Sequence, residues 1–289
     1  MRRCVFILGL LALLASMARA QRPTVSVLAL GSTPFAQTTA EKIRERLRST
    51  NEFQIADPDL TRAAAKGIGY SGSLNLSVSE ARDLGAALAT EFYIIGDAQT
   101  LRRSSSARAV YYESYCSLFA VSSRTGRLLF WDRPSVESDE PAEDKLLKDL
   151  FAGETLYRML IAIRRAGEDE HIQRNLVKVN SEPLIEEAPD SEQAAEIQGV
   201  RLPRPYVRMR PEYPESAARA QAEGVVDVLV DVGADGEVGQ VQIARWAGFG
   251  LDETTVATVR KMHFFPAMKN GSAIAMRVLL RYNFRKPPR

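Results

Sequence analysis

The chain has 289 residues, of which 45% are hydrophobic and 26% are charged, and its formal net charge is +2. This length allows two domains that each bury a core of their own, and the composition is that of a soluble globular protein. The small net charge excludes a general electrostatic attraction to nucleic acid or to anionic lipid, so we expect neither as a partner.

The first twenty residues have the pattern of a secretory signal peptide. Two arginines precede an apolar run from Cys4 to about Ala15, and Ala18-Arg19-Ala20 supplies the small residues of a cleavage site before Gln21. The run is shorter than the ~20 residues that a helix needs to cross the hydrocarbon core. We therefore expect residues 1–20 to be removed and the remaining chain to be exported. An uncleaved membrane anchor is the alternative.

Residues 21–166 are predicted to form an α/β domain, with a mixed sheet and flanking helices. Strands are expected where β-branched and aliphatic residues run together, and helices where apolar residues recur at helical spacing. Ser77, with Glu80 three residues later, predicts a capping box at the start of one helix. The strands are expected at 24–30, 53–57, 91–101, 109–123 and 126–134, and the helices at 38–50, 60–66, 76–88 and 144–165.

Three glycines of this domain imitate a dinucleotide-binding motif. Gly67, Gly69 and Gly72 fit the pattern G-x-G-x-x-G. The phosphate-binding motif requires a strand directly before it and a helix that opens from its last glycine. Here a helix-like stretch precedes the glycines, and the next helix is expected to start about five residues past Gly72. We therefore interpret the glycines as a helix end followed by a loop, with no nucleotide cofactor.

Residues suited to catalysis or metal binding are few and scattered. Cys116 is the only cysteine beyond Cys4, and its apolar neighbours favour a buried small hydrophobe. The two histidines, His171 and His263, are too far apart in sequence to indicate a zinc site. We expect no catalytic residue, no metal and no cofactor, and hence no enzyme. Asp97, at the expected end of a strand, is interpreted as a hydrogen-bonding residue of a turn.

Residues 167–204 are predicted to be a linker, and residues 205–289 a small α+β domain. The first segment is acidic and contains prolines, which is typical of a solvated linker. In the second, two alternating strands meet at Asp235-Gly236, a hairpin turn signal. A helix at 251–262 and a last strand at 273–284 complete a three-stranded antiparallel sheet packed with helices.

The segment from Pro211 to Phe284 strongly resembles the TonB C-terminal domain. Its landmarks are, in chain order, Tyr213-Pro214, Gly224-Val225-Val226, Asp235-Gly236, Gly250-Leu251-Asp252 and Phe264-Phe265-Pro266-Ala267. The resemblance covers about a quarter of the chain and implies a periplasmic module that binds a partner. In that family the last main strand offers an open edge, to which the TonB box of an outer-membrane transporter adds as a further strand.

The resemblance also implies which residues bind the partner. On the edge strand, expected from Ile274 to Phe284, Arg277 and Arg281 have an alternative role as charges that protect an open edge. For Tyr213-Pro214 the alternative is a rigid turn that starts the following helix. An open edge can also pair with a second copy, so a homodimer is possible. The implied partner-binding residues are Tyr213, Pro214, Ile274, Met276, Arg277, Val278, Leu280, Arg281 and Tyr282.

The α/β domain resembles TolB N-terminal and CsgG-like periplasmic domains. The residues that carry this resemblance are 24–31 and 81–98. Such domains are scaffolds or protein-binding modules. Two features depart from a conventional TonB energy transducer: the apolar run at the N-terminus has no histidine, and a globular domain replaces the long Pro-rich rod. We therefore expect a periplasmic two-domain binding protein. A membrane-anchored energy transducer, with residues 4–18 in the inner membrane, is the alternative.

Overall fold

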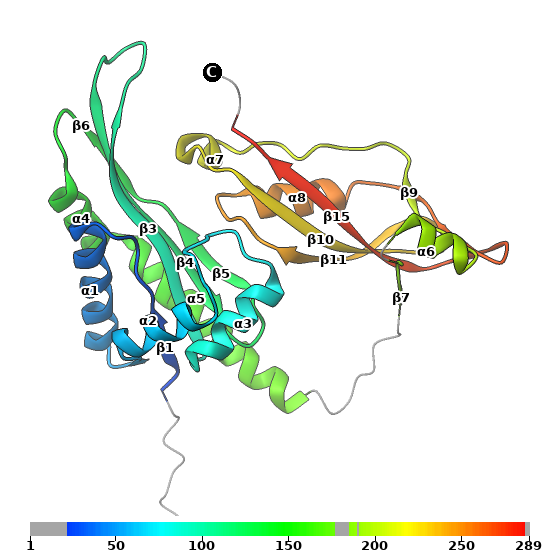
Figure 1. Ribbon diagram of the computed structural model, residues 1–289, viewed down its shortest axis with the longest axis horizontal. Helices are drawn as coiled ribbons and strands as arrows, with labels where there is room; N and C mark the ends of the chain where they lie inside the picture. Colours follow the sequence, from blue (N-terminus) through cyan, green and yellow to red (C-terminus); the bar gives the residue numbers. More distant parts are fainter. Residues whose placement is uncertain (1–21, 177–184, 190, 287–289) are drawn as a thin grey trace, which may run out of the picture.

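The computed structural model describes residues 22–176, 185–189 and 191–286, which form two domains in contact with each other (Figure 1). The expected signal peptide lies outside the described residues. Within the described ranges, no helix combines the length and the apolar character that crossing a membrane requires.

The first domain is built on a mixed sheet with the strand order β2-β1-β3-β4-β5, and β6 pairs with β4 (Figure 1). The pairs among β1, β2 and β3 are parallel, and those that involve β4 are antiparallel. The strands are β1 (Thr24–Val27), β2 (Gln54–Ile55), β3 (Phe92–Arg103), β4 (Tyr111–Ser122), β5 (Leu128–Asp132) and β6 (Ser135–Ser138). The helices are α1 (Pro34–Ser49), α2 (Pro58–Gly67), α3 (Val78–Leu88), α4 (Glu143–Ala152) and α5 (Glu154–Leu176).

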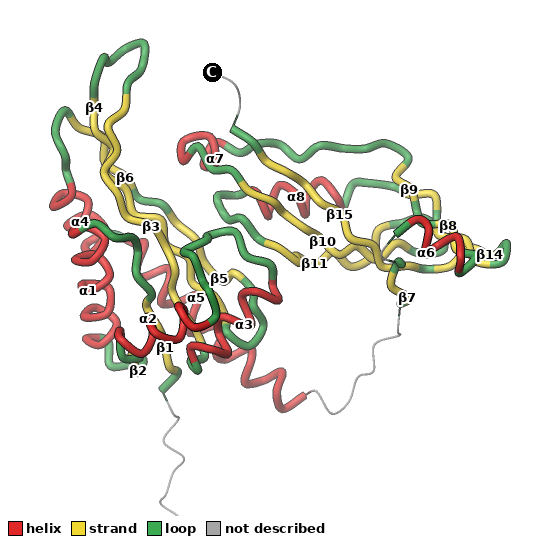
Figure 2. The backbone as a smooth tube through the Cα atoms, viewed as in Figure 1, coloured by secondary structure: helices red, strands yellow, loops and turns green. Residues whose placement is uncertain are grey.

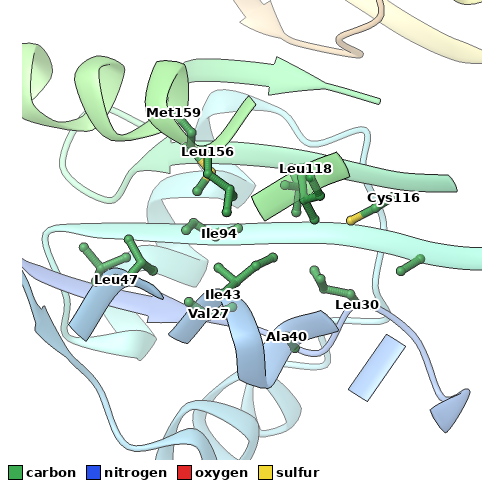
Figure 3. Close-up of a cluster of buried hydrophobic side chains, with 14 of the residues drawn as sticks. Val27, Leu30, Ala40, Ile43, Leu47, Ile94, Cys116, Leu118, Leu156 and Met159 are labelled. Carbon is green, nitrogen blue, oxygen red and sulfur yellow. The ribbon is translucent and has the colours of Figure 1, made fainter. Parts of the chain in front are cut away.

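Side chains on one face of this sheet pack against α1, α4 and α5 (Figure 3). Cys116, Leu118 and Ala120 of β4 point to this face, as strand alternation predicts. Ile43 of α1 and Met159 of α5 meet them from the helices. The predicted helix at 144–165 is two helices, because the chain breaks at Gly153.

The opposite face of the sheet is covered by α2 and α3 and by side chains of the second domain, of which Trp246 is the most deeply buried. Phe119 and Val121 of β4 point to this face, where they join Leu84 of α3 and Trp246. The capping box at the start of α3 is confirmed, since Ser77 and Glu80 bond each other's backbone amides. The core of the first domain is therefore completed by side chains from the second.

The second domain contains the sheet β11-β10-β15-β7 and the helix α8 (Figure 2). The hairpin at Asp235-Gly236 is confirmed, because β10 and β11 are antiparallel and Gly236 N donates to Gly233 O. The main elements are α7 (Glu215–Ala220), β10 (Gly224–Val232), β11 (Val238–Arg245), α8 (Leu251–Val259) and β15 (Met276–Phe284). The short elements are β7 (Glu186–Glu187), α6 (Glu192–Ile197), β8 (Val200–Arg201), β9 (Arg204–Pro205), β12 (Phe264–Phe265), β13 (Ala267–Lys269) and β14 (Ser272–Ile274).

The segment predicted as a solvated linker, 167–204, contains helices and strands in its described residues. The helix α5 extends past residue 166 to Leu176, and α6 and β8 pack on the second domain. Ala195 and Val200 are buried in that domain's core, and β8 pairs with β13. The acidic composition concealed this packing, because the apolar residues that reach the core are few and scattered among polar and charged ones. The second domain thus includes residues that precede position 205.

Candidate partner-binding edge

The candidate site is the strand β15, which lies between β10 and the short strand β7 (Figure 1). Its pairing with β10 is antiparallel and regular from Gly224↔Phe284 to Val232↔Met276. A regular ladder fixes the direction of every backbone group along the strand. The geometry of the outer edge can therefore be derived from any one hydrogen bond that leaves it.

One such bond identifies the residues whose backbone faces outward. Ala188 N donates to Arg277 O over 2.8 Å, so the carbonyl of Arg277 points away from β10. The N–H and C=O of one residue point to the same side of a strand, and this side alternates along the chain. Leu279, Arg281 and Asn283 therefore also direct their N–H and C=O groups to the outer edge. Among the described residues, no further strand pairs with β15 at these three positions.

The even-numbered residues of β15 have the opposite arrangement. Their side chains pack into the core of the domain, and their backbone groups point to β10. The expected contact residues Met276, Val278, Leu280 and Tyr282 belong to this set. Leu279, whose exposed fraction is 52%, is not among the contact residues expected from the sequence. The sequence shows that side chains alternate along the strand. Only the register against β10 shows which of these residues direct their backbone groups to the outer edge.

The two arginines of β15 are joined to buried aspartates of β10. Arg277 Nε and Nη2 donate to Asp231 over 2.6 and 2.9 Å, and Arg281 Nε and Nη2 donate to Asp227 over 2.8 and 2.9 Å. These bidentate pairs connect residues that are directly opposite in the ladder. The guanidinium groups thus stabilise the pairing of β15 with β10, the neighbouring strand inside the sheet.

Ile274 is not part of this edge, which corrects the expected strand. It belongs to β14 and pairs with Ala267 of β13 in a hairpin, and β15 begins only at Met276. The hairpin turns at Asn270 and Gly271, which both have positive φ. The sequence at 273–284 contains no turn signal, which hid the break between the two strands.

Tyr213 and Pro214 lie at the far end of β15. The Tyr213 ring is 6.5 Å from the ring of Phe284, and its Oη donates to Ala222 O over 2.7 Å. Pro214 is the residue that caps α7. Within the chain, the pair therefore has the local role of a turn that starts a helix and anchors it beside the edge strand.

A second surface of this domain contacts the first domain through the loop that follows β11. The Trp246 side chain is 1% exposed, stacks on Phe119 at 6.0 Å, and donates from Nε1 to Gly126 O over 3.0 Å. Asn75 links the backbones of both strand ends: its Nδ2 donates to Val225 O and Trp246 O, and its Oδ1 accepts from Val225 N. The partner-binding edge and the α/β domain are therefore joined by buried contacts.

Asp252 holds the loop that carries Trp246. Its carboxylate accepts from Ala247 N over 2.9 Å and from Gly248 N over 2.8 Å. Burial raises the pKa of Asp252 to about 7, against the two backbone hydrogen bonds, which lower it. The folded protein therefore binds this proton more tightly than the unfolded chain, so the contribution of Asp252 to stability falls as pH rises from about 4 to about 7.

We expect Asp252→Asn to destabilise the protein by about 1–3 kcal/mol, because the amide nitrogen cannot accept a bond from Gly248 N. The difference in free energy of unfolding between this variant and the unmodified protein should be larger at pH 5 than at pH 8. Only the protein with the aspartate loses stability as the pH rises over that interval. Urea denaturation at both pH values measures this. A difference that grows with pH would contradict the assignment.

The remaining candidate residues are placed in structural roles. Asp97 lies inside β3 and not at its end, where it accepts from Tyr115 Oη over 2.6 Å and from Gln99 Nε2 over 2.8 Å. Cys116 is fully buried, as predicted. Gly69 and Gly72 lie between α2 and α3 with positive φ, as expected for a loop. That loop leads to Asn75 and so to the contact between the domains.

Part of the second domain matches a known protein family. The family described as Gram-negative bacterial TonB protein C-terminal matches residues 209–285. The solution structure of the Pseudomonas aeruginosa TonB C-terminal domain is 24% identical, with a TM-score of 0.26, and covers 30% of this chain and 89% of that one. No curated protein matches the chain.

Other solved structures are similar to a larger part of the chain. Lipoprotein GNA1162 from Neisseria meningitidis is 12% identical, covering 45% of this chain and 93% of that one with a TM-score of 0.31. The LpoB C-terminal domain from Escherichia coli is 15% identical, covering 40% and 82% with a TM-score of 0.27. These scores are too low to support a conclusion about the α/β domain.

The second domain is thus a small α+β module with an edge strand. Residues 209–285 of this chain match the family of TonB C-terminal domains.

Proposed function

We propose that this protein binds an envelope partner by adding an extended segment of that partner to the outer edge of β15. The observation that carries the proposal is the set of outward backbone groups at Leu279, Arg281 and Asn283, which have no strand beside them among the described residues. Strand addition draws its affinity from main-chain hydrogen bonds of this kind.

The partner class that we propose is an outer-membrane transporter with an extended N-terminal segment. We propose that this protein binds the segment in the periplasm. The family match supports this class. The buried contacts of Trp246 make the α/β domain a body fixed to the binding edge, which suits a scaffold that positions the edge relative to a second envelope component. The alternative of a membrane-anchored energy transducer depends on residues 4–18, which lie outside the described residues. The mass of the exported protein decides between them.

Titration of the full chain with synthetic peptides from transporter N-terminal segments tests the proposal. We expect saturable binding together with slower hydrogen exchange at the amides of Leu279, Arg281 and Asn283, because these N–H groups acquire acceptors. The amides of Val278 and Leu280, which already face β10, provide the internal control. No binding, or binding that leaves the exchange of the three outer amides unchanged, would refute strand addition at this edge.

A further inference from the structure

The chain itself already occupies the beginning of the proposed binding edge. The strand β7 pairs with β15 in parallel, with Glu186 opposite Met276 and Glu187 opposite Arg277. One backbone bond continues the ladder, from Ala188 N to Arg277 O over 2.8 Å. An ion pair between Glu186 and Lys269 of β13 adds an electrostatic contact. The acidic segment is therefore in the position that a partner strand would take.

This internal strand is short. Its described pairing ends at Ala188, and residue 189 is a proline, whose fixed ring restricts the backbone and disfavours a longer strand. The side chains of Glu186 and Glu187 are exposed, and only Ala188 touches the core of the domain. A ladder of two residues with so little burial contributes little stability and can exchange with a longer strand.

We propose that residues 186–188 are an internal competitor for the partner strand, and that a partner which pairs along the whole of β15 displaces them. This proposal rests on the proposed function of the edge. It also specifies the partner further: the displacing segment runs parallel to β15 and carries an acidic residue that takes the place of Glu186 beside Lys269. Partner binding thereby releases residues 186–188 from the sheet.

The test weakens the internal strand and measures partner binding. The double variant Glu186→Lys with Ala188→Pro reverses the charge next to Lys269 and removes the N–H that bonds Arg277 O. We expect it to bind a transporter peptide about threefold to tenfold more tightly than the unmodified chain, which corresponds to the loss of one hydrogen bond and an exposed ion pair. The matched control is Glu196→Lys, the same charge change on the exposed side of α6, which should leave the affinity unchanged.

A second measurement needs no external partner. A synthetic peptide with the sequence of residues 182–189, added to the double variant at millimolar concentration, should shift the amide resonances of Met276 and Arg277 and should not shift them in the unmodified chain. The proposal of an internal competitor is refuted if this peptide does not bind the variant. It is also refuted if the variant and the unmodified chain bind a transporter peptide with equal affinity. If only the transporter peptides fail to bind while the chain's own peptide binds, the proposed partner class is wrong and the internal competitor stands.

Discussion

Replacement of Trp246 with alanine is expected to destabilise the protein by about 3–5 kcal/mol and to separate its two domains, which is the largest single effect that the structure predicts. The indole is 1% exposed and fills the second face of the α/β sheet, where it stacks on Phe119. Truncation would leave a cavity on this face and remove the hydrogen bond to Gly126 O.

Guanidinium denaturation measures the effect. The chain has two tryptophans, so in the Trp246→Ala variant all indole fluorescence reports on Trp131. We expect an earlier unfolding midpoint and a lag between the fluorescence transition and the loss of secondary structure measured by circular dichroism, since the domains no longer unfold together. Tyr206→Ala provides the control, because that ring is 55% exposed and lies away from the α/β domain. Equal midpoints for the two variants would show that the contact between the domains contributes nothing.

Most of the long strands and helices of both domains could be predicted because their signals are local. The alternation around Cys116, the capping box of Ser77 and Glu80, and the hairpin at Asp235-Gly236 each depend on residues within a few positions of one another. The contact between the domains has no such signal. Nothing in the sequence next to Trp246 distinguishes it from any other aromatic residue that follows a strand. Asn75, whose side chain donates to the backbone carbonyl of Trp246, lies in a loop about 170 positions earlier in the chain.

The candidate edge was predicted only in part for the same reason. The family landmarks locate the last strand, but its inner and outer residues depend on a register set by β10. The acidic strand β7 could not be predicted at all, since Glu186 and Glu187 have low β propensity. They form a strand because they pair with β15 and because Glu186 forms an ion pair with Lys269. Sequence patterns indicate which segments are strands, whereas the faces and edges that bind partners follow from non-local pairing.

Proline substitutions at two neighbouring positions of β15 should have different effects, one on partner binding and the other on stability, and they give the sharpest test of the outer edge. Leu279 directs its N–H to the outer edge, so Leu279→Pro removes a donor that no described strand uses. Proline is tolerated in an edge strand when its missing N–H faces outward. We expect a fold that is retained and an affinity for the partner peptide that falls about tenfold, because the strongest feature of strand addition is its backbone ladder.

Leu280 directs its N–H to β10, so Leu280→Pro should break the ladder inside the sheet and leave a carbonyl of β10 without its donor. The cost is at least about 1–3 kcal/mol of stability, with a corresponding fall in the denaturation midpoint. Leu279→Ala is the matched control, since it shortens the same exposed side chain and keeps the N–H; it should bind the peptide nearly as well as the unmodified chain. If Leu279→Pro and Leu279→Ala reduce binding equally, the partner recognises the side chain of Leu279 and not the backbone of the edge.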